Sequence, residues 1–338
     1  MMPAVTDNKP LSVVPPTSAV RRVRIGADAA GQRLDNFLLR ELKGVPKSRI
    51  YRLLRKGEVR VNGSRRDAEY RLQANDEVRL PPVRRAAEEA APTPGAGLIE
   101  RLNAAVIHED DRVLVLNKPA GVAVHGGSGI AHGVIEAMRA ARPNAPFLEL
   151  AHRLDRGTSG CLIIAKKRSA LRVLHELLRG RGVGKHYLAL VAGRLPRGRI
   201  PVEVALDRFQ LQGGERMVQV SEDGKASRSV FRAVRRFDQC TLAEVEISTG
   251  RTHQIRVHAA HIGHPIAGDD KYGDRAVNKA LREVGLRRLF LHAHRLTVTW
   301  PDAAPLEVEA PLPGDLTQVL DRLDDRKHPH DRAERGTE

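Results

Sequence analysis

A stretch of twelve residues, 86–97, divides the chain into a short part and a long part. It reads Ala-Ala-Glu-Glu-Ala-Ala-Pro-Thr-Pro-Gly-Ala-Gly and shows no apolar periodicity. Proline, glycine and small residues in such a run are typical of a linker. A linker here is incompatible with one core running through all 338 residues. It predicts a small domain over 21–85 and a large one over 98–320.

The two ends of the chain have the composition of disordered segments. Residues 1–20 contain four prolines and lack the apolar run of a signal peptide. Residues 321–338 are rich in charge, and their apolar residues show no periodicity. We therefore expect a disordered extension over 1–20 and a charged disordered tail over 321–338.

The cysteines and the apolar stretches of the chain indicate its cellular location. The only two cysteines, Cys161 and Cys240, cannot form a disulfide framework and have no metal-binding spacing. No uninterrupted apolar stretch is long enough to cross a membrane. These features favour a cytoplasmic protein without a membrane partner.

The positive charge is concentrated in the small domain. Residues 21–85 contain 18 lysines and arginines against 8 acidic residues, which gives +10 of the chain's net charge of +16. A basic module on a less charged body is typical of nucleic-acid binding. The alternative is a general bias of the source proteome toward arginine.

The basic module has a helix–helix–strand pattern. Apolar residues recur at helical spacing over 34–42 and again over 50–54, and Asn62-Gly63 separates short apolar segments typical of strands. On the second helix the cations lie away from the apolar stripe. They are Arg49, Arg52, Arg55 and Lys56. They form either an RNA-binding surface or an ordinary solvated helix face.

The large domain is dominated by strand patterns. Short runs of β-branched and aliphatic residues lie at 113–116, 187–191, 242–247 and 296–300, and few helical patterns come between them. Strands that mostly follow one another predict an α+β fold with a largely antiparallel mixed sheet.

The most reactive-looking segment is His-Arg-Leu-Asp-Arg-Gly-Thr-Ser-Gly, from His152 to Gly160. It places Asp155 between Arg153 and Arg156, in a loop just before an apolar strand pattern. An aspartate among glycine, threonine and serine commonly only closes a turn or caps a helix. In a chain whose charge indicates nucleic-acid binding it is also a candidate catalytic acid.

This segment resembles the active-site loop of the RluA family of pseudouridine synthases, whose pattern HRLDxxTSG it matches throughout. The resemblance implies that Asp155 is the catalytic carboxylate in the isomerisation of uridine to pseudouridine. A carboxylate can perform this reaction as a nucleophile at C1′ or as a base at C2′. The residues leave both routes open.

Further site residues follow from the same resemblance. The run Gly-Arg-Thr-His-Gln-Ile-Arg, 250–256, matches a second signature of the family, in which Arg256 pairs with the catalytic acid. Tyr187 matches the active-site tyrosine, which can stack on uracil. Arg153 matches the arginine that takes part in base flipping; its alternative role is a backbone phosphate clamp. The family uses no cofactor and no metal.

The segment 47–63 resembles the S4 RNA-binding domain. An S4-like unit followed by a synthase domain is closest, within the family, to the C type of bacterial large-subunit synthase. That resemblance implies 23S ribosomal RNA, or a large-subunit assembly intermediate, as the partner. A monomer is the expected state of a chain that binds RNA. The alternatives are a sibling of the D type, a synthase for another structured RNA, and a non-catalytic ribosome-assembly factor.

Several histidines cluster near the second signature, namely His253, His258, His261 and His264. Their spacing could suggest a metal site, but no cysteine or carboxylate set completes it. We interpret them as structural or RNA-facing residues. The chain has no phosphate-binding glycine loop for a nucleotide cofactor.

Overall fold

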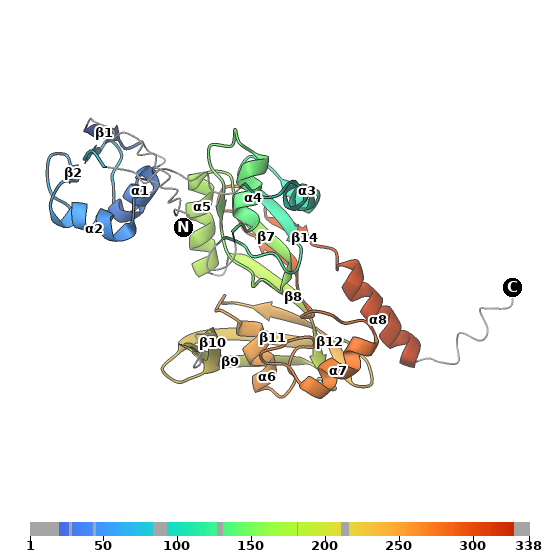
Figure 1. The fold of residues 1–338 in the computed structure, drawn as a ribbon. Coiled ribbons are helices and arrows are strands. Elements are labelled where there is room, and N and C mark those ends of the chain that lie inside the picture. The colour runs from blue at the N-terminus through green and yellow to red at the C-terminus, as the bar shows by residue number, and fades with distance from the viewer. Residues whose placement is uncertain are drawn as a thin grey trace, which may run out of the picture. The chain divides into compact units, whose positions relative to one another are not determined.

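The computed structural model describes residues 20–26, 29–42, 45–83, 93–126, 131–180, 182–210 and 216–327 (Figure 1). The chain divides into two compact units, 1–93 and 94–338. The predicted extension 1–20 lies outside the described residues except for Val20. Most of the predicted linker, 86–92, also lies outside them.

The first unit combines two helices with a three-stranded sheet. Its elements are β1 (Arg21–Arg24), α1 (Leu34–Glu41), α2 (Lys47–Arg55), β2 (Arg60–Val61) and β3 (Glu77–Leu80). The strands are antiparallel in the order β1-β3-β2. A core of buried side chains such as Phe37, Ile50 and Val78 lies between helices and sheet. The two helices and strand β2, directly before Asn62-Gly63, agree with the sequence pattern.

Strand β1 was not predicted, because three of its four residues are arginines and no apolar alternation marks it. It forms through its backbone pairing with β3. The segment around Arg71 contributes only an isolated bridge to Arg33. Nearby, the buried Asp76 carboxylate accepts hydrogen bonds from the hydroxyl of Tyr70 and the backbone amide of Gln73.

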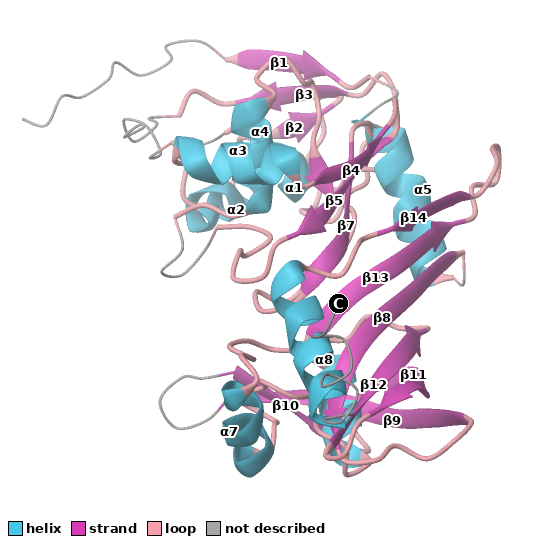
Figure 2. Ribbon diagram, turned by 90° about the vertical axis from the view of Figure 1, so that its right-hand side faces the viewer, coloured by secondary structure: helices cyan, strands magenta, loops and turns pink. Residues whose placement is uncertain are grey.

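The second unit is built on one large mixed sheet of eleven strands (Figure 2). The strands are β4 (Val106–Glu109), β5 (Val113–Lys118), β6 (Glu149–Leu150), β7 (Ser159–Ala165), β8 (Val183–Ala192), β9 (Arg199–Gln210), β10 (Arg216–Val220), β11 (Lys225–Arg236), β12 (Cys240–Ile247), β13 (Leu291–Val298) and β14 (Leu306–Glu309). They follow the order β10-β9-β11-β12-β8-β13-β7-β5-β4, with β14 beside β13 and β6 beside β7. Among the described pairs only β13 with β7 is parallel. The expected largely antiparallel mixed sheet is confirmed.

Helices accompany both halves of this sheet. They are α3 (Ala96–Ala104), α4 (Val134–Ala141), α5 (Arg168–Arg179), α6 (Gln254–His261), α7 (Arg275–Glu283) and α8 (Gly314–Lys327). Figure 1 shows α3, α4 and α5 near β7, and α6 and α7 near β9 to β12. Helix α6 packs against β9, β10 and β11. This contact fixes the helix that follows the Gly250–Arg251 turn.

Two predicted boundaries are wrong. Helix α3 begins at Ala96, inside the predicted linker. Helix α8 continues to Lys327, so the predicted disordered tail cannot begin at 321. Leu316, Val319 and Leu320 are buried in a core cluster, and Leu323 packs against it one turn later. That contact holds the charged end of the helix, whereas 328–338 lie outside the described residues.

Candidate active site

Asp155 lies in the turn that leads into β7. The Thr158 amide donates to the Asp155 carbonyl at 3.1 Å and closes the turn. Gly160 follows with φ +109°, and a Cβ there would lie 2.2 Å from the carbonyl oxygen of Ala293 on β13. Only glycine fits so close an approach of two backbones. The sequence Asp-Arg-Gly-Thr-Ser-Gly therefore places the carboxylate just before the first residue of β7, beside the parallel strand β13.

A fully buried lysine supports this turn from β5. The Lys118 Nζ donates to the carbonyls of Pro119, Val122 and Arg156 at 3.0, 2.9 and 3.4 Å. Arg156 Nε in turn donates to the Gly121 carbonyl at 2.9 Å. Burial lowers the pKa of Lys118 to about 7. These contacts tie the Asp155 turn to the loop after β5.

Asp155 lies on the wall shared by two hollows. The first, a cleft of about 120 Å³, has apolar sides that include Leu154, Ile255 and Leu291, and Tyr187 also lines it. The second is wider, and its cationic lining is formed by Arg153, Arg156, Arg256, Lys271, Arg287 and Arg288. The cleft has the mixed lining of a small-ligand site, and the wider hollow has the charge to hold a polyanion.

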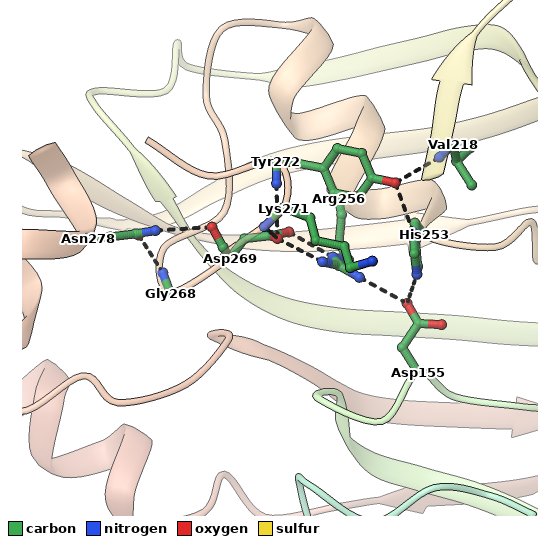
Figure 3. A network of polar contacts seen from close by, with 9 residues as sticks. All are labelled: Asp155, Val218, His253, Arg256, Gly268, Asp269, Lys271, Tyr272 and Asn278. Atoms are coloured by element: carbon green, nitrogen blue, oxygen red, sulfur yellow. Dashed lines mark hydrogen bonds and ion pairs between the residues drawn. The ribbon is translucent and has the colours of Figure 1, made fainter. Parts of the chain in front are cut away.

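Arg256 lies between two carboxylates (Figure 3). Its Nε and Nη2 donate to Asp269 at 2.7 Å each, whereas its Nη1 is 3.8 Å from Oδ2 of Asp155. The Asp269 side chain is 0% exposed, and the amides of Lys271 and Tyr272 also donate to it. Burial alone would raise the pKa of Asp269, but the bonds from Arg256 hold it below its ordinary value.

Arg256 thus lies beside Asp155, as the resemblance implies, but its short bonds go to Asp269. The sequence interpretation missed Asp269, because thirteen residues separate it from Arg256 and no motif links the two. A general signal existed, since a buried arginine usually forms two parallel bonds with one carboxylate.

Tyr187 projects from β8 into the cleft wall and is only 8% exposed. Burial, together with the negative charge of Asp155, raises the pKa of Tyr187 above its ordinary value. Its hydroxyl has no hydrogen-bond partner within the described part of the chain. The phenol is therefore neutral at physiological pH and presents a ring and a free hydroxyl to the site.

His253 also reaches Asp155, although the sequence interpretation gave it no role in the site. Its Nε2 lies 3.9 Å from Oδ2 of Asp155, and its Nδ1 lies 2.9 Å from the Tyr272 hydroxyl. The Tyr272 ring lies under the guanidinium of Arg256 at 5.0 Å. His253 lies inside the second signature, so its position three residues before Arg256 was a usable signal, whereas no such signal pointed to Tyr272.

Arg153 is exposed and lines both hollows next to Asp155. Its guanidinium forms no ion pair or hydrogen bond with any described residue. A cation that lacks a protein partner is available to a ligand.

The four predicted RNA-binding cations belong to the first unit, whereas every residue lining the cleft belongs to the second. On α2 the buried stripe consists of Ile50, Leu53 and Leu54. The cations lie off this stripe; Arg49 is half-buried and the other three, Arg52, Arg55 and Lys56, are exposed. None of the four side chains bonds to a residue that the structure describes.

Two of the other clustered histidines have structural contacts. His258 Nε2 lies 2.8 Å from the Ser227 hydroxyl, and His264 Nδ1 lies 2.8 Å from the Ala192 carbonyl. Across the described ranges, no group of three His, Cys, Asp or Glu side chains is placed to hold a metal ion. None of the described helices is long and apolar enough to span a bilayer.

Comparison with known proteins gives matches for both units. Residues 112–261 match the RNA pseudouridylate synthase family model, and residues 32–78 match the S4 domain model. The ribosomal large subunit pseudouridine synthase C of Escherichia coli K12 is 54% identical over 311 residues, covering 91% of this chain and 98% of that protein. The protein of that name from Haemophilus ducreyi is 53% identical over 301 residues, covering 88% and 94%.

Solved structures show the same fold. The human RNA pseudouridylate synthase domain containing 4 superposes with a TM-score of 0.57 at 26% identity, covering 68% of this chain and 96% of that one. The human RNA pseudouridylate synthase domain containing 1 gives a TM-score of 0.52 at 28% identity, covering 65% and 86%.

A mixed sheet carrying a carboxylate turn beside an apolar cleft, preceded by an S4 domain, defines an RNA pseudouridine synthase, which is an isomerase. Over nearly its whole length the chain belongs to the family of the ribosomal large subunit pseudouridine synthases C. The resemblance drawn from the motifs is confirmed.

Proposed function

We propose that this enzyme converts uridines of 23S ribosomal RNA to pseudouridine, with Asp155 as the reacting carboxylate. The observation that carries the proposal is the position of Asp155 on the wall between a base-sized cleft and a wider cationic hollow. The relatives named above, which act on the large ribosomal subunit by their names, support the choice of RNA. A sibling specificity of the D type remains the alternative target.

The reaction needs a negative group at the ribose and no redox step. The bond between N1 and C1′ breaks, the uracil turns, C5 bonds to C1′, and C5 loses a proton while N1 gains one. Asp155 acts either as a nucleophile at C1′ or as a base that removes the C2′ proton. The 23% exposed Asp155 side chain and the guanidinium of Arg256 suit either route.

Uridine labelled with deuterium at C2′ separates the two routes. Removal of the C2′ proton predicts a primary isotope effect on the single-turnover rate. Attack at C1′ breaks no bond to C2′ and predicts a rate close to that of unlabelled RNA. Either result identifies the bond that Asp155 acts on.

The remaining residues have roles in holding RNA. Enzymes that modify a base inside a helix extrude it first, and we assign to Arg153 the task of holding the flipped conformation. The Tyr187 ring stacks on the uracil. Arg49, Arg52, Arg55 and Lys56 bind phosphates, as their unpaired side chains permit. We further propose a monomer in the cytoplasm, in keeping with two free buried cysteines.

The central test uses cells that lack the gene, complemented with the normal enzyme or with Asp155→Asn. Pseudouridines are mapped in their ribosomal RNA. We expect a defined set of sites to be present with the normal enzyme and absent with the variant. Retained modification with Asp155→Asn would refute the catalytic assignment. If no ribosomal site depends on the gene, the RNA target is wrong.

The S4 unit is tested through the salt dependence of RNA binding. Replacing the three exposed cations Arg52, Arg55 and Lys56 by glutamine should weaken binding and reduce the slope of log K against log salt by up to about 3. The matched control removes three exposed cations of α7, Arg275, Lys279 and Arg282. Equal losses in both variants would show that only total charge matters. Such a result would refute a specific role of α2.

A further inference from the structure

His253 has an unusual backbone at the start of α6. Its φ and ψ are 53° and 17°, in the left-handed region, and it is the residue before the first helical residue, Gln254. Only Asn62 and Asn75 share a positive φ among the described non-glycine residues. Such a conformation is costly for histidine and is kept where the side chain must point in a particular direction. Here it points the imidazole at Asp155 (Figure 3).

The hydrogen bonds around Tyr272 determine which nitrogen of His253 carries the proton. The Val218 amide of β10 donates to the Tyr272 hydroxyl oxygen at 2.9 Å. The same oxygen lies 2.9 Å from Nδ1 of His253. If Nδ1 carried the proton, the hydroxyl oxygen would accept twice and its own proton would have no acceptor here. The satisfied arrangement has the hydroxyl donating to Nδ1, which leaves the proton on Nε2.

Two donors therefore face one oxygen of Asp155. Nε2 of His253 lies 3.9 Å from Oδ2, and Nη1 of Arg256 lies 3.8 Å from the same atom. Oδ1 has no partner among the described residues. The two contacts attract Oδ2 through charge and dipole, so the carboxylate is turned with Oδ1 outward.

The surroundings keep the imidazole neutral. Burial lowers the pKa of His253, as do the charges of Arg256 and Lys271, and together these outweigh the opposite effect of Asp155 and Asp269. Tyr272 is the remaining titratable group against the ring, and its own pKa is raised by burial. A neutral donor holds the carboxylate without protonating it.

We propose that His253, set in its Nε2–H tautomer by Tyr272, is a positioning residue that fixes Oδ2 of Asp155 and presents Oδ1 as the reacting oxygen. The proposal rests on the role of Asp155 stated above. It assigns to β10 and Tyr272 a part in the geometry of the site, through a chain of contacts from Val218 to the carboxylate.

The tautomer is measured directly by ¹⁵N spectroscopy of histidine-labelled enzyme without RNA. The signals of residue 253 are identified by their loss in His253→Asn. We expect an unprotonated, pyridine-like Nδ1 and a protonated Nε2 near neutral pH. Tyr272→Phe keeps the ring under Arg256 but removes the hydroxyl, and it should shift the Nδ1 signal toward a mixture of tautomers. A protonated Nδ1 in the normal enzyme would overturn the proposal.

Kinetics of two matched variants test the effect on the reaction. His253→Asn tolerates the positive φ and can still accept from Tyr272, but its amide is too short to reach Asp155. We expect kcat to fall by about 10- to 100-fold with KM for RNA unchanged. His253→Gln reaches Asp155 with its amide N–H and should recover most of that loss. Urea unfolding verifies that both variants fold.

Two outcomes separate this proposal from the proposed function. If Asp155→Asn is inactive and His253→Asn keeps its normal kcat, only the positioning role fails. If Asp155→Asn retains activity, the catalytic assignment itself fails. Tyr272→Phe is expected to lower kcat by about three- to tenfold, the effect of one hydrogen bond. A change in KM alone would contradict a positioning role for the network.

Discussion

The two carboxylates on either side of Arg256 differ in how tightly the protein holds them. Asp269 is 0% exposed and receives two guanidinium bonds of 2.7 Å and two backbone amide bonds. Asp155 is 23% exposed, and its nearest side-chain partners are the guanidinium of Arg256 at 3.8 Å and the neutral imidazole of His253 at 3.9 Å. One arginine therefore completes a saturated pair on one side and leaves an incompletely satisfied acid on the other.

The difference shows how a fold can present a reactive charge. Arg256 is itself buried, and an arginine in that position must be neutralised at close range. Asp269 does this, so the guanidinium can influence Asp155 without forming a closed ion pair with it. An acid locked in a two-bond pair would be too well stabilised to attack or accept a proton. We therefore regard Asp269 as the structural counter-ion of Arg256 and Asp155 as the reacting carboxylate.

The largest expected effect compares the same substitution at the two positions. Asp155→Asn should lower activity by about 10³-fold or more and change stability by about 1 kcal/mol or less, because its ion pair is long and partly exposed. Asp269→Asn should cost about 3–5 kcal/mol of stability, since it leaves a buried arginine uncompensated. Urea unfolding and single-turnover assays measure both. A large stability loss in Asp155→Asn would contradict the distinction between a catalytic Asp155 and a structural Asp269.

Arg256→Lys affects both sides at once. A lysine has the charge but not the planar fork that serves Asp269, and it cannot reach both carboxylates. We expect a loss of about 1–3 kcal/mol in stability and a fall of about 10- to 100-fold in kcat. Asp269→Asn combined with Arg256→Lys tests the coupling. If the two stability losses simply add, the two residues do not act as a pair.

Part of this arrangement was legible in the sequence. The segment 152–160 identified Asp155 because its turn residues are local, and a turn is fixed by its own glycines and short polar side chains. Arg256 and Tyr187 followed from family motifs. The succession of strand patterns with few helical patterns between them predicted the mostly antiparallel sheet.

The missing part consists of contacts between distant segments. Asp269 and Tyr272 follow α6, and only the folded chain brings them back under Arg256. The direction of the His253 side chain depends on a left-handed backbone conformation, which the pattern of residue types does not predict. Strand β1 and the end of α8 were missed for the same reason, since tertiary partners stabilise both.

His258 on α6 extends the comparison to pH. The Ser227 hydroxyl donates to the Val204 carbonyl, so His258 must donate from Nε2, and its buried Nδ1 has no partner among the described residues. Burial lowers the pKa of His258 to about 4. The folded state then binds fewer protons than the unfolded state below pH 6.5, so stability is lost as pH falls from about 6.5 to 4. His258→Gln keeps the donor and should remove about 3 kcal/mol of that acid loss.

The measurement for His258 is the free energy of unfolding of both proteins at intervals between pH 4 and 7. His152 and His292, whose pKa values burial also lowers to about 4, continue to contribute to the slope in both proteins. The difference between the two curves therefore isolates one histidine. Parallel curves would show that protonation of His258 does not contribute to the loss of stability between pH 7 and 4.

The smallest expected effect is at Tyr187, which lines the cleft with Asp155. Its hydroxyl has no hydrogen-bond partner in the described structure, so Tyr187→Phe should change stability by about 1 kcal/mol or less. If the ring only stacks on uracil, kcat should fall by less than about tenfold. Tyr187→Leu, which removes the stacking face, provides the contrast and should cost more in RNA turnover. A loss in Tyr187→Phe as large as that of Asp155→Asn would mean that the hydroxyl moves a proton. Asp155 would then share the chemistry with a second group on the same side of Arg256.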